Sequence, residues 1–313
     1  MNKKSLIREK ILITGITGFV GSHLHKKLND IGATVYGISK SKKGKNIYNI
    51  DITNYRAIES IVKNKKISIC FHLASEALVE TGQTDPYKTF TTNIQGTINI
   101  LELARKYKFK KIIITSTSHV YGLNKLPYLE KYTPKPTRPY ETSKACTDLI
   151  AESYAGTFGL PIIIPRFVNI YGPGDLNFTR LIPKTIKSII TNTNPRMWGG
   201  GVIRDFIYID DVINAYILLA CYNKYDKLNT TFNFGGSSKI TVEELIQKII
   251  YLSKKNLEID HITDRRESEI TSQYVSWNKA KELLNWKPKV SLEQGLTITL
   301  DWYNNYFKKT KHI

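Results

Sequence analysis

The sequence predicts an α/β protein with a Rossmann-like, doubly wound parallel sheet and a smaller C-terminal domain. Short β-branched apolar runs alternate with helical patterns over the first half of the chain, as expected for parallel strands and their covering helices. A glycine-rich turn joins the first apolar run to the first helical pattern. The length of 313 residues and the hydrophobic content of 41% suffice for one large or two modest domains.

Composition excludes several classes of protein. The formal net charge is +19, but the lysines are dispersed without interleaved aromatic residues, so we interpret the charge as a solvated surface and expect no nucleic-acid partner. The three cysteines, Cys70, Cys146 and Cys221, lie far apart without metal-site spacing. They indicate a reducing, cytoplasmic location. We expect no metal and, because no apolar run reaches membrane-spanning length, no membrane partner.

The first predicted unit is a strand at residues 11–14, a glycine turn and a helix at residues 22–31. Glycines permit a tight turn and let backbone N–H groups approach a pyrophosphate at the positive end of the helix. An ordinary tight turn is the alternative, but the flanking strand and helix favour dinucleotide binding. The candidate contacts in this turn are Gly15, Gly18, Phe19, Val20 and Gly21.

The next two predicted strands cover residues 34–38 and 47–52. The first lacks the terminal acid that would bind the adenosine ribose of NAD. Instead, Ser39 and Lys40 begin a lysine-rich loop that would either hold a 2′-phosphate or lie in solvent, so this feature leaves NAD and NADP open. Asp51, followed by Ile52, is a candidate acceptor for the adenine amino group.

Three further strands are predicted at residues 67–74, 111–115 and 161–165. The first has a polar exit at the carboxyl edge of the sheet, where His72 is interpreted as structural and Leu73, Ala74 and Ser75 are candidate cofactor contacts. Residues 87–106 have helical periodicity, with Asn93 inside.

A second candidate site lies at the start of a helix predicted from Tyr140 to Phe158. Tyr140 and Lys144 are separated by one helical turn, so they share a face. An ammonium beside a phenol stabilises the phenolate, lowers the phenol pKa and favours a general base. Such pairs also occur on solvated helix faces. The nearby hydroxyl-rich strand end at residues 115–118 supports the catalytic interpretation.

The pattern changes after Arg166. We expect a loop at residues 169–175, a strand at 204–211 that returns to the main sheet, a helix at 212–221, another helix from Thr241 and a final aromatic helix around Trp302. The predicted division assigns residues 1–168, with 204–222 returning, to a dinucleotide-binding domain. Residues 169–203 and 223–313 form the smaller domain.

Together these motifs resemble the extended short-chain dehydrogenase/reductases that act on nucleotide sugars, the NAD-dependent epimerase/dehydratase family. The matching motifs lie at residues 14–21, 72–74, 93–97, 120–122 and 139–144. Residues 174–183 in the later half are most similar to CDP-glucose 4,6-dehydratases. The resemblance covers nearly the whole chain and makes the smaller domain a substrate domain that binds a nucleotide-diphosphate sugar.

The resemblance implies that Tyr140 takes a proton from the sugar C4 hydroxyl while hydride passes to a tightly bound cofactor. Lys144 would tune the tyrosine and hold the nicotinamide ribose, and Thr117 would bind the C4 oxygen. NAD(H) is favoured on family grounds, with NADP(H) as the alternative. Asn93 and Val168 join the cofactor contacts. The implied substrate-binding residues are Ser118, His119, Asn169, Arg180, Arg204, Arg265 and Arg266.

One departure from the family bears on the reaction. The dehydratases follow the catalytic threonine with an acid and a base, whereas this chain has Ser118 and His119. Serine is a poor acid, so we expect an NDP-hexose or NDP-heptose 4-dehydrogenase or 4-epimerase for surface polysaccharide synthesis. A 4,6-dehydratase, with His119 as base, is the alternative. A non-enzymatic nucleotide sensor is a third interpretation, disfavoured because Thr117, Tyr140 and Lys144 are all retained.

The resemblance also implies a homodimer. In the resembled family, the helix that carries Tyr140 and the preceding long helix from Tyr87 pair with their copies. With Tyr140 facing inward, Cys146, Ile150 and Tyr154 would lie toward the partner.

Overall fold

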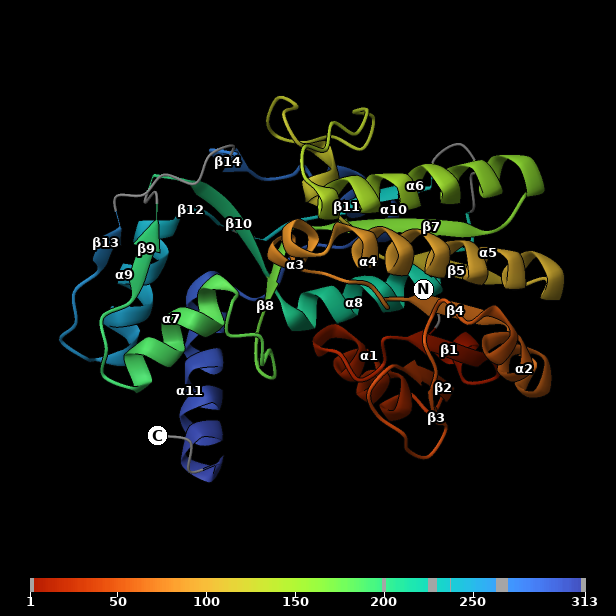
Figure 1. The fold of residues 1–313 in the computed structure, drawn as a ribbon, viewed down its shortest axis with the longest axis horizontal. Helices are drawn as coiled ribbons and strands as arrows, with labels where there is room; N and C mark the ends of the chain where they lie inside the picture. Colours follow the sequence, from red (N-terminus) through yellow and green to blue (C-terminus); the bar gives the residue numbers. More distant parts are fainter. Residues whose placement is uncertain (1–2, 199–200, 225–229, 237, 263–269, 311–313) are drawn as a thin grey trace.

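A computed structural model describes residues 3–198, 201–224, 230–236, 238–262 and 270–310. Figure 1 shows a large part built around a parallel sheet and a smaller part formed by later segments of the chain. The chain crosses between the two parts several times, so neither part is one continuous segment.

Within the described residues, the main sheet has eight strands, all parallel. Its order is β11-β7-β5-β4-β1-β2-β3, with β6 paired to β7. The six strands predicted for the first half are confirmed, although the third ends at Asn49 rather than at residue 52. Chain order reverses between β1 and β4, which is where such sheets bind ligands. The bounds are β1 Lys10–Thr14, β2 Thr34–Ser39, β3 Ile47–Asn49, β4 Ile69–His72, β5 Lys111–Ile114, β6 Ser116–Thr117, β7 Ile162–Phe167 and β11 Thr231–Phe234.

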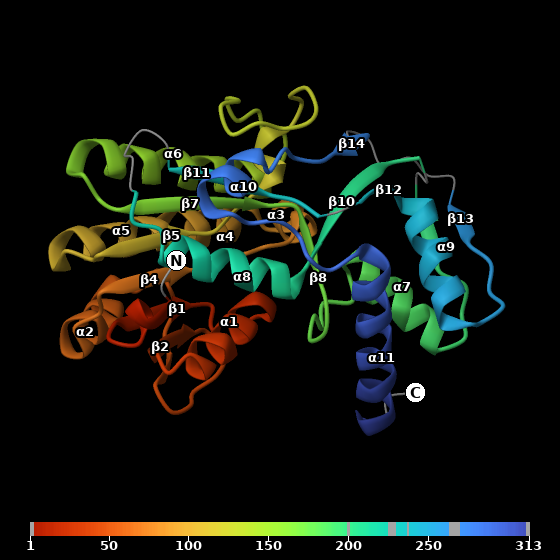
Figure 2. The ribbon, with the colours of Figure 1, turned by 180° about the vertical axis from the view of Figure 1, so that it is seen from behind.

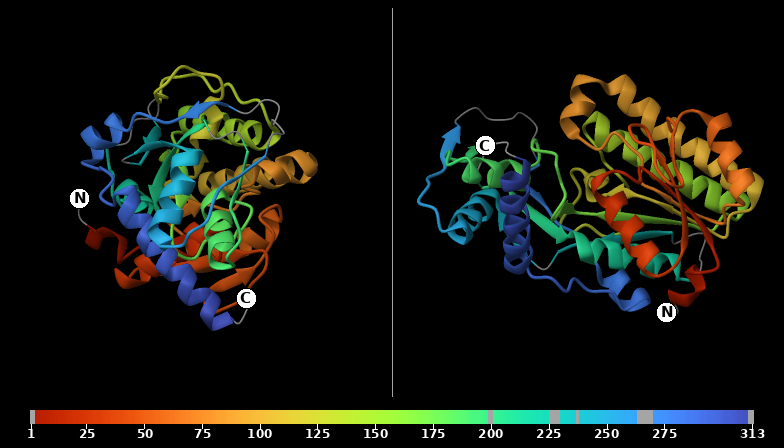
Figure 3. Two further views of the ribbon diagram at one scale, coloured as in Figure 1. Left: turned by 90° about the vertical axis from the view of Figure 1, so that its left-hand side faces the viewer. Right: turned by 90° about the horizontal axis from the view of Figure 1, so that it is seen from below.

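Helices cover both faces of this sheet. In β1, Ile11 and Ile13 pack into one core and Leu12 into the other, because successive side chains of a strand point to opposite faces. The right-hand view of Figure 3 shows the two helical layers. One layer contains α1 (Phe19–Asp30) and α8 (Ile209–Ala220), and the other contains α2 (Tyr55–Lys65), α5 (Gly96–Tyr107) and α6 (Pro139–Phe158). Burial on both faces explains the continuous apolar runs.

The helix predicted at residues 87–106 is divided in the structure into α4 (Pro86–Phe90), a π-helical turn at Thr91–Gln95 and α5. A further short helix, α3 (Val79–Thr84), precedes it. The extra residue of a π turn changes the direction of the side chains that follow, and such turns are frequent at functional sites. Here the turn contains Asn93, which is buried against α6.

The smaller part contains a four-stranded sheet. Its strands are β8 (Asn169–Tyr171), β10 (Ile203–Tyr208), β12 (Lys239–Thr241) and β14 (Ser272–Gln273). The prediction that residues 204–211 return to the main sheet is therefore wrong for the strand, because β10 pairs with β8, β12 and β14. The predicted loop at 169–175 likewise begins with strand β8. Of residues 204–222, which were predicted to return, only helix α8 packs on the main sheet. The edge strand of that sheet, β11, comes from residues 223–313, which were assigned to the smaller domain.

The remaining elements complete the smaller part and its junction with the main sheet. As predicted, α9 begins after Thr241, whose side chain and that of Glu244 form a capping box. Figure 2 shows α11, the predicted last aromatic helix, beside α7 and α9. None of the described helices is long and apolar enough to cross a membrane. The bounds are α7 Leu181–Ile190, β9 Arg196–Trp198, α9 Val242–Ser253, β13 Asp260–Ile262, α10 Asn278–Leu284, α11 Leu292–Thr310 and the 3₁₀ turns Lys3–Leu6 and Ser118–Tyr121.

Candidate active site

The glycine turn between β1 and α1 brings three backbone segments close together. Gly15 has a φ of +70°, and a Cβ atom there would lie 2.9 Å from the Ala74 nitrogen. A Cβ atom at Gly21 would lie only 2.2 Å from the Gly15 oxygen. Helix α1 begins at Phe19 without a side-chain cap from Gly18, so the N–H groups of its first turn, including that of Val20, face the turn. This arrangement fits a pyrophosphate.

The segment after β4 is fixed beside this turn. Thr14 Oγ1 accepts hydrogen bonds from the Leu73 and Ala74 nitrogens, each at 3.1 Å. His72 lies between Thr14 and Thr97, with its ring nitrogens 2.8 and 3.1 Å from their hydroxyls. Burial lowers the pKa of His72 to about 3, so the ring is neutral. The interpretation of His72 as structural agrees with these contacts, which also place Ser75 at the sheet edge.

The residues that follow β2 and β3, where the adenosine is expected to bind, form a pair of opposite charges. Lys40 Nζ lies 3.1 Å from Asp51 Oδ2, and Ser39 Oγ lies 2.7 Å from Thr17 Oγ1. Because Asp51 balances the Lys40 charge, this edge is less suited to a 2′-phosphate than the lysine-rich sequence implied. Ile52 is buried beside the pair.

Three predicted catalytic residues converge at the start of α6. Tyr140 and Lys144 are 9% and 5% exposed and face the carboxyl edge of the sheet from adjacent turns. The Lys144 ammonium donates a hydrogen bond to the Thr115 carbonyl at the end of β5. Thr117, in the short strand β6, interacts through its side chain with the Tyr140 phenol. A hydroxyl, a phenol and an ammonium thus share one buried corner.

The expected effect of Lys144 on Tyr140 is not found. Burial raises the pKa of Tyr140 to about 12, although Arg180 and Thr117 act in the opposite direction. Burial also lowers the pKa of Lys144 to about 8, opposed by Asp148. Helical spacing places both groups on one face, but it does not show that the ammonium is directed to a backbone carbonyl or how strongly both groups are desolvated.

The residues in the dehydratase acid and base positions differ in their surroundings. Ser118 is buried in a 3₁₀ turn, whereas His119 Nδ1 lies 3.5 Å from Glu141 Oε1. Burial raises the pKa of Glu141, but His119 and Arg138 outweigh it and lower the pKa to about 2. This carboxylate was not predicted from the sequence, where its signals are its position directly after Tyr140 and three residues after Arg138.

Two predicted cofactor contacts are buried at the junction of the elements. Asn93 accepts a hydrogen bond from the Glu76 nitrogen at 2.8 Å and donates one to Ser143 Oγ at 2.8 Å. It therefore links the segment after β4 to α6. Val168 is buried after β7, where its N–H donates to the Phe234 carbonyl. Their contact with a cofactor stays a prediction.

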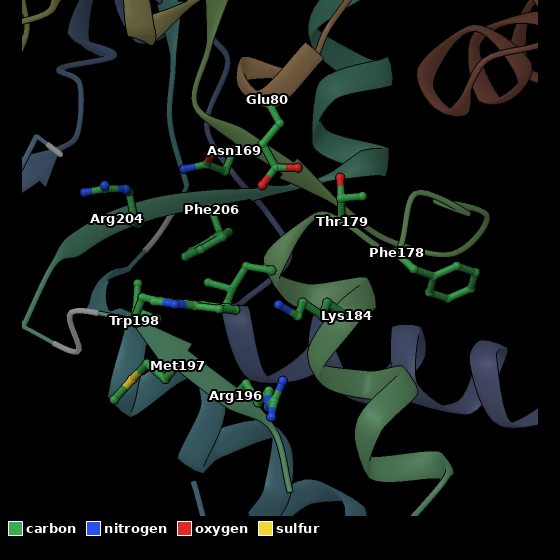
Figure 4. A pocket seen from close by; sticks show the side chains of 12 residues that line it. Glu80, Asn169, Phe178, Thr179, Lys184, Arg196, Met197, Trp198, Arg204 and Phe206 are labelled. Atoms are coloured by element: carbon green, nitrogen blue, oxygen red, sulfur yellow. The ribbon is translucent and has the colours of Figure 1, made fainter. Parts of the chain in front are cut away.

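A cavity of about 470 Å³ is lined mainly by residues of the smaller part, together with Glu80 of α3 (Figure 4). Asn169 and Arg204 line it, as predicted for substrate-binding residues. Arg180 directly precedes α7 as its N-cap residue and is ion-paired with Asp175 at 3.0 Å. Arg265 and Arg266 lie outside the described residues. The complete lining is Glu80, Asn169, Phe178, Thr179, Leu181, Lys184, Arg196, Met197, Trp198, Arg204, Phe206 and Val242.

Most of this lining was not predicted from the sequence. Lys184 lies with its ammonium 4.1 Å from the centre of the Trp198 ring, and Arg196 lies across the cavity from Glu80 (Figure 4). A tryptophan and an arginine within the short strand β9 were the available signal. The described residues contain no group of three or more His, Cys, Asp or Glu side chains that could hold a metal ion.

Comparisons with known proteins assign the chain to a family. The model of the NAD dependent epimerase/dehydratase family matches residues 11–235. The chain belongs to this family. Its members are NAD-dependent enzymes of the extended short-chain dehydrogenase/reductase group, so the predicted family, fold class and NAD cofactor are confirmed.

Relatives within this family catalyse different reactions. The chain is 30% identical to UDP-glucuronate 4-epimerase of Thermodesulfobacterium geofontis, over 96% of this chain and 98% of the relative. It is 27% identical to human dTDP-D-glucose 4,6-dehydratase, over 97% and 93% of the two chains. The crystal structure of Thermotoga maritima UDP-glucose 4-epimerase with UDP-glucose has a TM-score of 0.88 at 30% identity, covering 95% of this chain and 99% of that one.

The glycine turn leads to a prediction about the cofactor. The purified protein should release NAD on denaturation, and Gly21→Ala should reduce the NAD content at least about tenfold because the new Cβ would meet the Gly15 oxygen at 2.2 Å. Chromatography of the denatured supernatant measures the content. Gly156→Ala is the matched control, since a Cβ there meets nothing within 4 Å. Absence of nicotinamide cofactor, together with no binding of added NAD, would contradict the prediction.

Proposed function

We propose that this protein oxidises the C4 hydroxyl of a nucleotide-diphosphate sugar with bound NAD, as a 4-dehydrogenase or a 4-epimerase. The observation that carries the proposal is the convergence of Thr117, Tyr140 and Lys144 in one buried corner. The arrangement supplies proton transfer where a sugar and a nicotinamide would meet.

In the proposed reaction, Tyr140 in its phenolate form takes the proton of the C4 hydroxyl. Thr117 donates a hydrogen bond to the C4 oxygen and holds it in line with the phenol. Lys144 holds the nicotinamide ribose and, when charged, favours the phenolate. Bound NAD supplies the hydride acceptor. Gly15, Gly18 and the first turn of α1 would hold its pyrophosphate.

The cavity supports a nucleotide diphosphate as the anchoring part of the substrate. Lys184, Arg196 and Arg204 line it, and guanidinium groups bind phosphate oxygens with forked hydrogen bonds. These three cations gather around one cavity, whereas the lysines are dispersed along the sequence. Phe206 and Trp198 add apolar surface for a base or sugar.

One observation favours the 4,6-dehydratase alternative. His119 is paired with the buried carboxylate of Glu141 at 3.5 Å, and such a pair could remove a proton from C5. Elimination also requires an acid that protonates the departing C6 oxygen, and Ser118 occupies that position. We therefore propose C4 oxidation without loss of water ahead of dehydration.

A panel of nucleotide sugars tests the proposed function. UDP-, GDP-, CDP- and dTDP-hexoses and a GDP-heptose are incubated with the NAD-loaded protein, and absorbance of reduced nicotinamide is followed together with products by NMR. A 4-keto sugar or the C4 epimer is the expected product for at least one substrate. Absence of hydride transfer with every member would overturn the proposal and favour a nucleotide-sensing role.

The assembly and the cellular role are also part of the proposal. We propose a homodimer through α5 and α6, which is supported by Leu149 on α6, whose side chain is 56% exposed. Cys146, Ile150 and Tyr154 would border that contact. The division into a cofactor domain and a substrate domain, a cytoplasmic location and a role in surface polysaccharide synthesis complete the proposal. Light scattering at micromolar concentration should give twice the monomer mass.

A further inference from the structure

We infer that Asp148 is a positioning residue of the catalytic corner, which keeps the Lys144 ammonium charged in its buried place. This inference rests on the proposed function, in which a charged Lys144 favours the Tyr140 phenolate. Asp148 lies on α6, one helical turn after Lys144, and no sequence motif singled it out. It belongs to a buried polar network that connects α6 with β7.

The position of Asp148 puts its charge beside Lys144. Residues at i and i+4 of a helix lie on the same face, and α6 is helical throughout from Pro139 to Phe158. Asp148 is 0% exposed and Lys144 is 5% exposed. Both charges are therefore removed from water, where opposite charges attract each other more strongly than at a solvated surface. The carboxylate thus supports the ammonium in a place where burial favours the neutral amine.

Asp148 is itself held in place by Arg166 of β7. The Arg166 Nε donates a hydrogen bond to Asp148 Oδ2 at 2.8 Å, and the Arg166 Nη1 donates one to the Tyr121 phenol oxygen at 2.9 Å. That phenol donates in turn to Asn233 Oδ1 on β11 at 2.8 Å. A guanidinium is protonated at every accessible pH. Asp148 therefore keeps a charged partner, and its carboxylate is fixed between α6 and β7.

The second oxygen of Asp148 leaves negative charge available to Lys144. Asp148 Oδ1 is buried and accepts no hydrogen bond within the described part of the chain. Two other titratable groups face Lys144, His72 from β4 and Tyr140 from α6. Both are neutral near pH 7, because burial lowers the pKa of His72 to about 3 and raises that of Tyr140 to about 12. Burial lowers the pKa of Lys144, and Asp148 opposes this change.

The titration of Lys144 can be measured without any substrate. In NAD-loaded protein labelled with ¹³C at the lysine Cε, heteronuclear NMR follows each lysine with pH, and the Lys144 signal is identified by its absence from Lys144→Arg. Its midpoint in the wild type should lie near pH 8, below the value of about 10.4 for solvated lysines. Asp148→Asn should lower this midpoint by at least about one pH unit, whereas Asp148→Glu should keep it within about half a unit of the wild type.

The proposed reaction gives a second measurement on the same variants. Because kcat/KM is expected to rise with pH only while Lys144 is charged, the pH at which the rise weakens should fall in Asp148→Asn together with the NMR midpoint. Loss of a purely structural contact would instead lower kcat/KM equally at every pH. Glu152→Gln is the matched control, because Glu152 lies one turn further along α6 and 3.9 Å from Arg166, but its side chain is 42% exposed. It should leave the Lys144 midpoint unchanged.

Asp148→Asn leaves the buried Arg166 without its carboxylate, which is costly for the fold. If that variant does not retain NAD, Asp148→Asn combined with Arg166→Gln removes both charges and should lower the midpoint in the same direction. An unchanged Lys144 midpoint in a folded, NAD-loaded variant, or an equal decrease in Glu152→Gln, would overturn the inference. If Lys144 titrates as expected but no sugar supports hydride transfer, the proposed function fails while the effect of Asp148 on Lys144 stands.

Discussion

Tyr140→Phe should lower the rate of hydride transfer by at least about a hundredfold, the usual share of general acid–base catalysis. The variant loses only the phenol oxygen, so the ring keeps its place in the buried corner and the NAD content should not change. The Thr117 hydroxyl would remain in place for the C4 oxygen, but the phenolate that takes the proton in the proposed reaction would be missing. Single-turnover measurement of reduced nicotinamide after mixing with a substrate of the wild type gives the rate.

The pKa values of Tyr140 and Lys144 also predict how kcat/KM depends on pH in the same experiment. Because burial raises the pKa of Tyr140 to about 12, the phenolate fraction of the wild type grows with pH, and kcat/KM should rise between pH 6 and 8. At about pH 8, half of the Lys144 side chains have lost their charge, and the rise should weaken from there. The residual rate of Tyr140→Phe should lack this slope.

Tyr87→Phe is the matched control, because that tyrosine is 81% exposed whereas Tyr140 is 9% exposed. It should behave as the wild type. A Tyr140→Phe variant that turns over at a near-normal rate would remove Tyr140 from the mechanism, and an unchanged pH profile would assign the titration to another group.

Local features of the fold were readable from the sequence because they depend on neighbouring residues. The run from Ile11 to Thr14, the glycines after it and the cap at Thr241 each determine a strand, a turn or a helix start by short-range rules. The pairing of β10 was misassigned because a short apolar strand fits either sheet. Its partners, β8 and β14, are brought to it only by the tertiary fold.

Some residues of the candidate site were likewise predictable from the sequence and others were not. Tyr140, Lys144 and Thr117 belong to motifs with characteristic spacing, so the sequence placed them together. Glu80 and Lys184 come from separate helices that meet around one cavity, and isolated charged residues on surface helices usually lie in solvent. The sign of the Tyr140 pKa shift was wrong because burial, which spacing does not reveal, outweighs the nearby cation.

The second large effect concerns the product. With Ser118 in the position of the dehydratase acid, oxidation at C4 should proceed and loss of water across C5 and C6 should be slower by about 10² to 10⁴-fold, the contribution of a general acid. This corresponds to about 3 to 5 kcal/mol in the barrier. Mass spectrometry of the nucleotide sugar should therefore show a 4-keto sugar or an epimer of unchanged mass, and no main product lighter by roughly 18 mass units, one water.

The substitution Ser118→Asp gives a second test of this prediction, because it introduces the acid that the wild type lacks. Aspartate at position 118 would lie beside His119, which Glu141 holds at 3.5 Å, so an acid and a candidate base would then flank the sugar. Loss of water should rise at least about tenfold over the wild type while hydride transfer stays within about threefold. Ser118→Asn, of nearly the same shape but unable to donate a proton as an acid, is the control. Water loss in the wild type at the rate of hydride transfer would instead show that elimination needs no acid at residue 118, and the dehydratase alternative would then replace the proposed function.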